Sequence, residues 1–164
     1  MKIVVGISDM QISVSREDLL VTHGLGSCIG VVVYDPILKI GGMLHYMLPQ
    51  AGIKAKEPNF NPFTYGDSGI QIMIREMVHK GCKKGNLVIV MAGGSAINSS
   101  EKNDFFAIGK RNHTIAKKVF WKEQILVTKE HVGGNISRSL YLDMQTGNIW
   151  FMSKGTRFDL FGGI

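Results

Sequence analysis

Apolar residues in the first fifty positions of the chain group into short runs that are typical of β-strands. Residues 2–7, 11–15 and 19–22 predict three short strands. The runs at 28–34 and 39–48 are longer and almost continuously apolar, and Asp35-Pro36-Ile37-Leu38 lies between them. Asp followed by Pro suits the first two positions of a type I turn. Two strand-like runs joined by such a turn predict a β-hairpin.

The remainder of the chain alternates between helical and strand-like patterns. Ile70, Ile74, Met77 and Val78 recur at helical spacing and predict a helix over 67–80, which Gly81 would end. We further expect a strand at 86–92, a helix at 109–122, a strand at 124–129 and a closing hairpin at 138–153, with polar loops at 51–65 and 98–104. Because strict strand–helix alternation is absent, the pattern favours an α+β fold. We expect a single domain over residues 1–164, a layered sandwich of a mixed, mostly antiparallel β-sheet with flanking helices.

The predicted hairpin brings one thiol close to one imidazole. A turn centred between Pro36 and Ile37 would pair residues whose numbers add up to 73, as those of Cys28 and His45 do. Cross-strand partners on one face have Cβ atoms about 4.5–5.5 Å apart, and a shift of one residue would place them on opposite faces. A thiol beside an imidazole can become a thiolate, which is a strong nucleophile.

Glycines precede the cysteine in Gly24-Leu25-Gly26-Ser27. They permit a tight backbone path, and the backbone N–H groups of Gly26 and Ser27 are candidates for an oxyanion hole. The competing interpretation is structural, since a cysteine in an apolar strand is often a small buried hydrophobe and a lone histidine is often a satisfied core residue.

Charge and composition narrow the functional classes. The formal net charge is +6, which favours acidic partners. The basic residues are scattered and not interleaved with aromatic ones, so we do not expect nucleic-acid binding. The sequence lacks metal-ligand spacing, an apolar run of membrane-spanning length and a secretory pattern at Met1. With two cysteines, of which Cys82 is expected to be structural, we predict a cytoplasmic protein without metal, cofactor or membrane insertion.

Several separated motifs then carry a family resemblance. They are Thr22-His23-Gly24-Leu25-Gly26-Ser27-Cys28, Asp35-Pro36, His45 with Met47-Leu48-Pro49, Tyr65-Gly66-Asp67, Ala92-Gly93-Gly94, Ile108-Gly109-Lys110-Arg111-Asn112, and Gly133-Gly134-Asn135 with Arg138. In this order they resemble the chemoreceptor glutamine deamidase family, CheD, over nearly the whole chain.

The resemblance implies a protein-glutamine glutaminase of bacterial chemotaxis. It would convert chemoreceptor glutamine side chains to glutamate and release ammonia through a thioester, with Cys28, His45 and Thr22 as the catalytic set and no cofactor. It also implies a receptor methylesterase side activity and a CheC-type phosphatase as a partner. Arg111 and Arg138 are candidates for contact with an acidic substrate.

The chain departs from the family pattern at two positions. The family often has an acidic residue where this chain has His131, and Gly where it has Ser137. Two alternatives to the deamidase stay open at this point. One is a non-catalytic adaptor that binds a CheC-type phosphatase or receptors, and the other is a different acyl-transfer enzyme, such as a cysteine protease or a transglutaminase.

Overall fold

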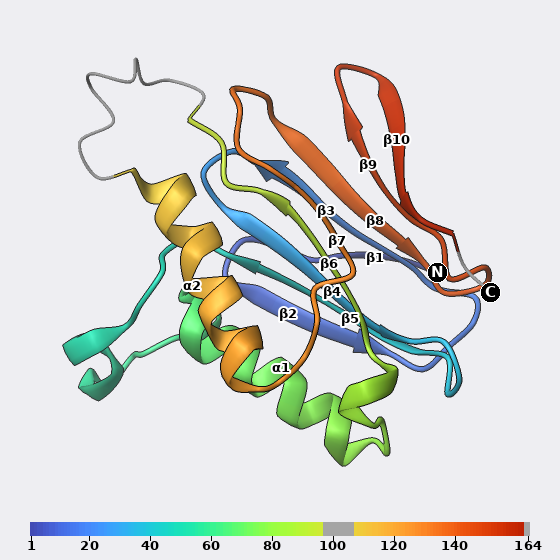
Figure 1. Cartoon of the computed structure of the whole chain (residues 1–164), viewed down its shortest axis with the longest axis horizontal. Coiled ribbons are helices and arrows are strands. Elements are labelled where there is room, and N and C mark those ends of the chain that lie inside the picture. Colours follow the sequence, from blue (N-terminus) through green and yellow to red (C-terminus); the bar gives the residue numbers. More distant parts are fainter. Residues whose placement is uncertain (97–106, 163–164) are drawn as a thin grey trace.

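The computed structural model describes residues 1–96 and 107–162, so the predicted loop at 98–104 lies outside the described residues. Two five-stranded sheets and two longer helices form the fold (Figure 1). The first sheet has the order β1-β3-β8-β9-β10, with bounds Lys2–Val4, Leu19–Leu25, Arg138–Asp143, Ile149–Ser153 and Thr156–Phe161. The second has the order β2-β5-β4-β6-β7, with bounds Asp9–Ser13, Ile40–Tyr46, Ile29–Asp35, Val88–Gly93 and Lys129–Val132. Short 3₁₀ turns lie at Gly52–Lys56, Pro62–Thr64 and Lys84–Asn86.

Each sheet is mixed but mostly antiparallel, as the sequence predicts. Among the strand pairs described, β1 with β3 and β6 with β7 run parallel, and the other pairs are antiparallel. The helices α1 (Gly66–His79) and α2 (Ile108–Lys122) begin and end within one residue of the predicted positions. The α+β sandwich is therefore confirmed.

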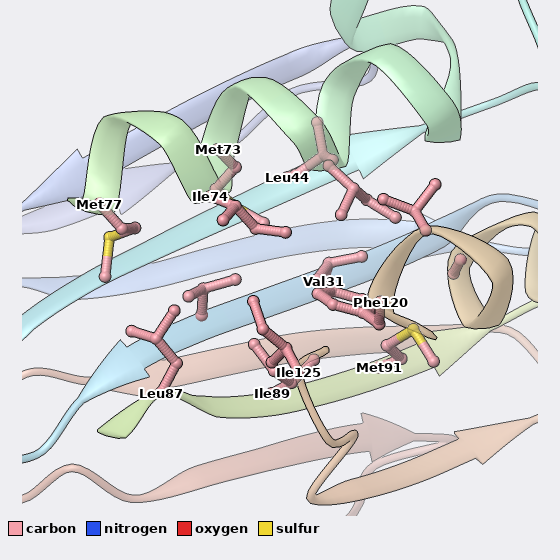
Figure 2. Packing of buried hydrophobic residues seen from close by; sticks show 14 of the residues in the cluster. Val31, Leu44, Met73, Ile74, Met77, Leu87, Ile89, Met91, Phe120 and Ile125 are labelled. Carbon is pink, nitrogen blue, oxygen red and sulfur yellow. The ribbon is translucent and has the colours of Figure 1, made fainter. Parts of the chain in front are cut away.

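The second sheet is the middle layer of the molecule. Val31 of β4 and Leu44 of β5 are register partners and both point toward the helices, where Met73 of α1 and Phe120 of α2 pack with them (Figure 2). This apolar cluster accounts for the helical spacing of the stripe on α1, since one face of the helix covers the sheet.

The opposite face of the second sheet packs on the first sheet. Val32 and Met43 contribute from the second sheet, and Leu140 and Phe151 from the first. Strands β4 and β5 are buried along their whole length, with one face toward the helices and the other toward the first sheet. Their continuous apolar runs in the sequence follow from this double burial.

Several strand predictions need correction. The first two strands, expected at 2–7 and 11–15, are observed at Lys2–Val4 and Asp9–Ser13. The predicted strand at 124–129 is paired only from Lys129 onward, because Ile125 packs into the helix-side core and the Thr128 hydroxyl accepts from the Ile89 backbone N–H before the ladder begins. Strand β10 was not predicted, since its residues are largely exposed at the edge of the first sheet. In the described part of the chain, we find no helix with the length and apolarity needed to span a membrane.

Candidate active site

The β4–β5 hairpin has a different register from the one predicted. His45 lies opposite Gly30, not opposite Cys28, and Asp35 lies opposite Ile40. The turn therefore comprises residues 36–39 and is centred one position later than expected. Lys39 adopts a positive φ of 58°, and the Asp35 carboxylate accepts the backbone N–H groups of Ile37 and Leu38.

The correction moves the pairing by two residues, which keeps Cys28 and His45 on the same side of the sheet. Both face the first sheet, and Cys28 packs against the inter-sheet core. Cys28 is therefore a diagonal neighbour of His45, at a typical Cα separation of about 7–8 Å rather than directly opposite. Gly30, between them, presents no side chain.

Thr22, on β3 of the first sheet, lies next to His45 of the second sheet. A β-bulge between Thr22 and Leu25 inserts one extra residue into β3 relative to β8. Gly24, inside the bulge, has a positive φ of 69°. After Leu25 the chain leaves the first sheet and enters the second at Ile29. Bulges of this kind redirect side chains and are frequent beside active sites. Thr22 and His45 are completely buried, while Cys28 is partly exposed immediately before β4.

Hydrogen bonds fix the proton on the imidazole of His45. The Thr22 hydroxyl donates to the Val5 carbonyl oxygen over 2.7 Å, which uses its only proton. Thr22 Oγ1 also lies 2.7 Å from His45 Nδ1, so at this contact Oγ1 accepts and Nδ1–H donates. The proton is therefore on Nδ1, and Nε2 carries the free lone pair. Within the described residues, this buried Nε2 has no hydrogen-bond partner.

The resting site is a neutral pair. Burial lowers the pKa of His45 from 6.5 to about 4. Burial also raises the pKa of the Cys28 thiol above 9.0, an effect partly offset by the residue's own backbone N–H. At neutral pH the proton therefore stays on sulfur, and the imidazole is available as a base rather than as a preformed imidazolium.

Asp9 is the register partner of His45 on the other neighbouring strand, β2. Its carboxylate accepts from the Met10 backbone N–H and from the Gln11 side chain. This arrangement fits the lowered pKa of His45, because the carboxylate interacts with its own strand and does not stabilise a positive charge on the ring.

Glycines hold the backbone around Cys28. The Cys28 carbonyl oxygen accepts from the Gly94 N–H over 2.9 Å, and a side chain at Gly93 would collide with that same oxygen. The Gly93-Gly94 pair thus permits β6 to approach Cys28 closely, at positive φ angles of 120° and 65°.

Of the two residues predicted to form an oxyanion hole, Gly26 already uses its N–H. It donates to the Gly24 carbonyl over 3.0 Å. For Ser27 and Cys28, the described part of the chain offers no backbone acceptor to the N–H. Of the two predicted donors, the Ser27 N–H therefore remains available, and the adjacent Cys28 N–H is a further candidate.

Asn112 lies beside the candidate site, although no role for it was predicted from the sequence. It is completely buried on α2, and its Nδ2 donates to the carbonyl oxygens of Ser27 and Met47 over 2.9 and 2.8 Å. Its position could have indicated a role, because Asn112 is a polar residue on the same helix face as the buried Ile115 and Ala116.

The two predicted substrate-binding arginines lie in very different surroundings. Arg138 is 2% exposed, and it donates to His131 Nδ1, Ser95 Oγ and the carbonyls of Gly93 and Gly133. Arg138 thereby joins the backbone segments that follow β6 and β7 near Cys28. Because its donors are used in these contacts, we no longer expect it to contact a substrate. Arg111 is exposed on α2, one residue before Asn112.

The two departures from the family pattern also lie near Arg138. The imidazole of His131 accepts from the guanidinium over 3.0 Å. The Ser137 carbonyl accepts from Ser153 Oγ of β9. The His131 contact involves its side chain, whereas the Ser137 contact involves only the backbone and would also form with glycine at that position.

A partly exposed thiol on the same face as a buried, neutral imidazole is an arrangement typical of cysteine-dependent acyl transfer. Comparison with known proteins gives the particular family. A family model described as CheD chemotactic sensory transduction matches residues 47–153. The chain belongs to the CheD family.

Individual relatives are similar over most of the chain. A protein of Syntrophus aciditrophicus (strain SB), named probable chemoreceptor glutamine deamidase CheD 1, is 37% identical over 93% of this chain and 94% of its own length. A probable chemoreceptor glutamine deamidase CheD of Solibacter usitatus (strain Ellin6076) is 37% identical over 97% of this chain and 93% of its own. One from Clostridium botulinum (strain Eklund 17B / Type B) is 40% identical over 88% of each. The matched range of the family model begins after His45, whereas the similarity to these relatives extends over nearly the whole chain.

Proposed function

We propose that this protein is a chemoreceptor glutamine deamidase of bacterial chemotaxis, with Cys28 as nucleophile, His45 as base and Thr22 as the group that orients the base. The observation that carries the proposal is the hydrogen bond from His45 Nδ1–H to Thr22 Oγ1. It leaves the Nε2 lone pair free to act as the proton acceptor. Membership of the CheD family and the names of its relatives supply the reaction and the substrate class.

In the first step, His45 Nε2 takes the proton of the Cys28 thiol as the sulfur attacks the glutamine carboxamide carbon. An S–C bond forms, and the carbonyl π electrons move to oxygen. Closure of the gap between the diagonal neighbours accompanies substrate binding, since hydrogen bonds of free enzymes often tighten only in the complex. The resulting imidazolium then protonates the leaving nitrogen, the C–N bond breaks, and ammonia departs from a thioester.

In the second step, His45 takes a proton from water, and the water oxygen attacks the thioester carbon. The C–S bond breaks, the sulfur regains its proton from the imidazolium, and glutamate is released. Both steps pass through an oxyanion, for which the N–H groups of Ser27 and Cys28 are the donors. One such donor typically contributes about 10²–10³ in rate.

The substrate is a glutamine on an acidic surface. The net charge of +6 would draw the protein to the glutamate-rich helices of a receptor. The exposed Arg111, beside Asn112 on α2, is the candidate for contact with such a surface. The same acyl-transfer steps would release methanol from a receptor glutamate methyl ester.

The proposal is tested by incubating a glutamine-bearing receptor fragment with the protein and measuring ammonia together with the mass of each tryptic peptide. Parent protein should convert specific amides to acids. Cys28→Ala and His45→Gln should not, whereas Cys82→Ser should act like the parent, since Cys82 is buried in the helix-side core. Receptor binding without a mass change would instead favour the adaptor, and backbone cleavage or crosslinking a different acyl-transfer enzyme.

A further inference from the structure

We infer that Asn112 is a positioning residue that sets the orientation of the Ser27–Cys28 peptide, so that the Cys28 N–H faces the reacting carbonyl as an oxyanion donor. This inference rests on the proposed deamidase function and assigns to that site a residue from α2. Asn112 does not touch the reacting atoms and acts through the backbone of the nucleophile loop.

The contacts of Asn112 join both halves of the site. Its Nδ2 donates to the carbonyl of Ser27, immediately before the nucleophile, and to the carbonyl of Met47, two residues after the base. Both neighbours of Nδ2 are carbonyl oxygens, so the orientation of the amide is unambiguous. One side chain therefore fixes the distance between the segment that carries Cys28 and the segment that carries His45.

Holding the Ser27 carbonyl also determines where the next N–H points. In a planar trans peptide, the carbonyl of one residue and the N–H of the next point in opposite directions. With the Ser27 oxygen directed at the helix, the Cys28 N–H is directed away from it. That N–H interacts with the Cys28 sulfur and partly offsets the rise in the thiol pKa that burial causes. It is thus next to the atom at which the tetrahedral carbon forms.

The helix itself is anchored to the strand that bears the base. The Tyr46 hydroxyl donates to the Asn112 carbonyl oxygen over 2.5 Å, and Tyr46 directly follows His45. In contrast, Asn112 Oδ1 is buried and, among the described residues, lacks a hydrogen-bond partner. Burying an unsatisfied acceptor is unfavourable, so the side chain is not explained by stability alone.

The test compares two reactions of Cys28 that differ in whether they need an oxyanion donor. Deamidation of a receptor glutamine passes through an oxyanion. Alkylation by iodoacetamide forms an S–C bond and releases iodide without one, so it reports the ionisation and access of the thiol alone. The variants are Asn112→Asp, which keeps the shape but replaces the donor, and Asn112→Ala. Val119→Ala, seven residues further along the same buried face of α2, is the control for a simple loss of packing.

For both Asn112 variants we expect kcat of deamidation to fall by about 10²–10³, the typical effect of losing one oxyanion donor. KM should stay within about threefold of the parent. Cys28 alkylation, assigned by peptide mapping, should slow by no more than about tenfold, because the Cys28 N–H only partly offsets the rise in the thiol pKa that burial causes. Val119→Ala should lower the melting temperature while keeping kcat.

Three outcomes would overturn the inference. The first is that folded Asn112 variants keep the parent kcat. The second is that Cys28 alkylation slows as much as deamidation does. The third is that kcat of Val119→Ala falls to the same extent. A parent protein that alkylates normally but releases no ammonia would instead refute the proposed function, and this inference with it.

Discussion

Acidification should destabilise the protein specifically through His45. The folded state holds this imidazole neutral with a pKa of about 4, whereas the unfolded chain has the ordinary value of 6.5. Between these values the unfolded state binds a proton that the folded state does not, so stability rises with pH. The stabilisation is fully present above pH 6.5 and is lost as the pH falls toward 4. One pKa unit corresponds to 1.36 kcal/mol, so the free energy of unfolding should drop by about 2 kcal/mol at pH 5 and about 3 kcal/mol at pH 4.

The measurement is urea unfolding at a series of pH values for the parent and for His45→Gln, which cannot titrate. The other four histidines are common to both proteins. The difference between the two stability curves therefore isolates His45. Curves that stay parallel to within about 0.5 kcal/mol from pH 7.5 to pH 4 would refute the buried, neutral imidazole.

Three further predictions follow from the same contacts. Thr22→Val should slow deamidation by roughly tenfold or more, because it removes a hydrogen bond of about 1 kcal/mol that sets both the tautomer and the orientation of the His45 ring. Thr22→Ser should keep the deamidation rate within about threefold of the parent. Equal rates for the two variants would contradict this role of Thr22. Arg138→Met should lower the free energy of unfolding by about 2–4 kcal/mol, since it leaves buried acceptors unpaired. A raised KM without loss of stability would instead indicate that Arg138 contacts the substrate. Deamidation should weaken as salt rises, and Arg111→Ala should flatten that dependence; a parent rate that does not change with salt would exclude electrostatic attraction.

The face shared by Cys28 and His45 could be predicted from the hairpin pattern, but their pairing could not. The apolar pattern predicted both β4 and β5. The error in their pairing was two residues, and because side chains alternate with a period of two, Cys28 and His45 stayed on the same side of the sheet. The register itself depends on Lys39 adopting a left-handed conformation, which is uncommon for a residue other than glycine. Asp35 stabilises that turn through hydrogen bonds that sequence spacing does not reveal.

Contacts between segments far apart in the sequence also could not be predicted. The roles of Asn112 and Arg138 depend on how α2 and β8 pack against the loop before β4, and that packing joins residues up to 85 positions apart. As a basic residue in a family motif, Arg138 was expected to contact the substrate. In the structure it is buried, and its hydrogen bonds show a structural role. Strand β10 was missed because an exposed edge strand shows little of the apolar alternation on which prediction depends.

The central claim is that Cys28 forms a thioester with a receptor glutamine. The most direct test is to run the reaction with hydroxylamine present, which attacks a thioester and leaves a hydroxamate on the receptor side chain. We expect hydroxamate at the same glutamines that are otherwise converted to glutamate, with the parent protein and not with Cys28→Ala. Glutamate formation that continues with Cys28→Ala, or without any hydroxamate from the parent, would contradict it.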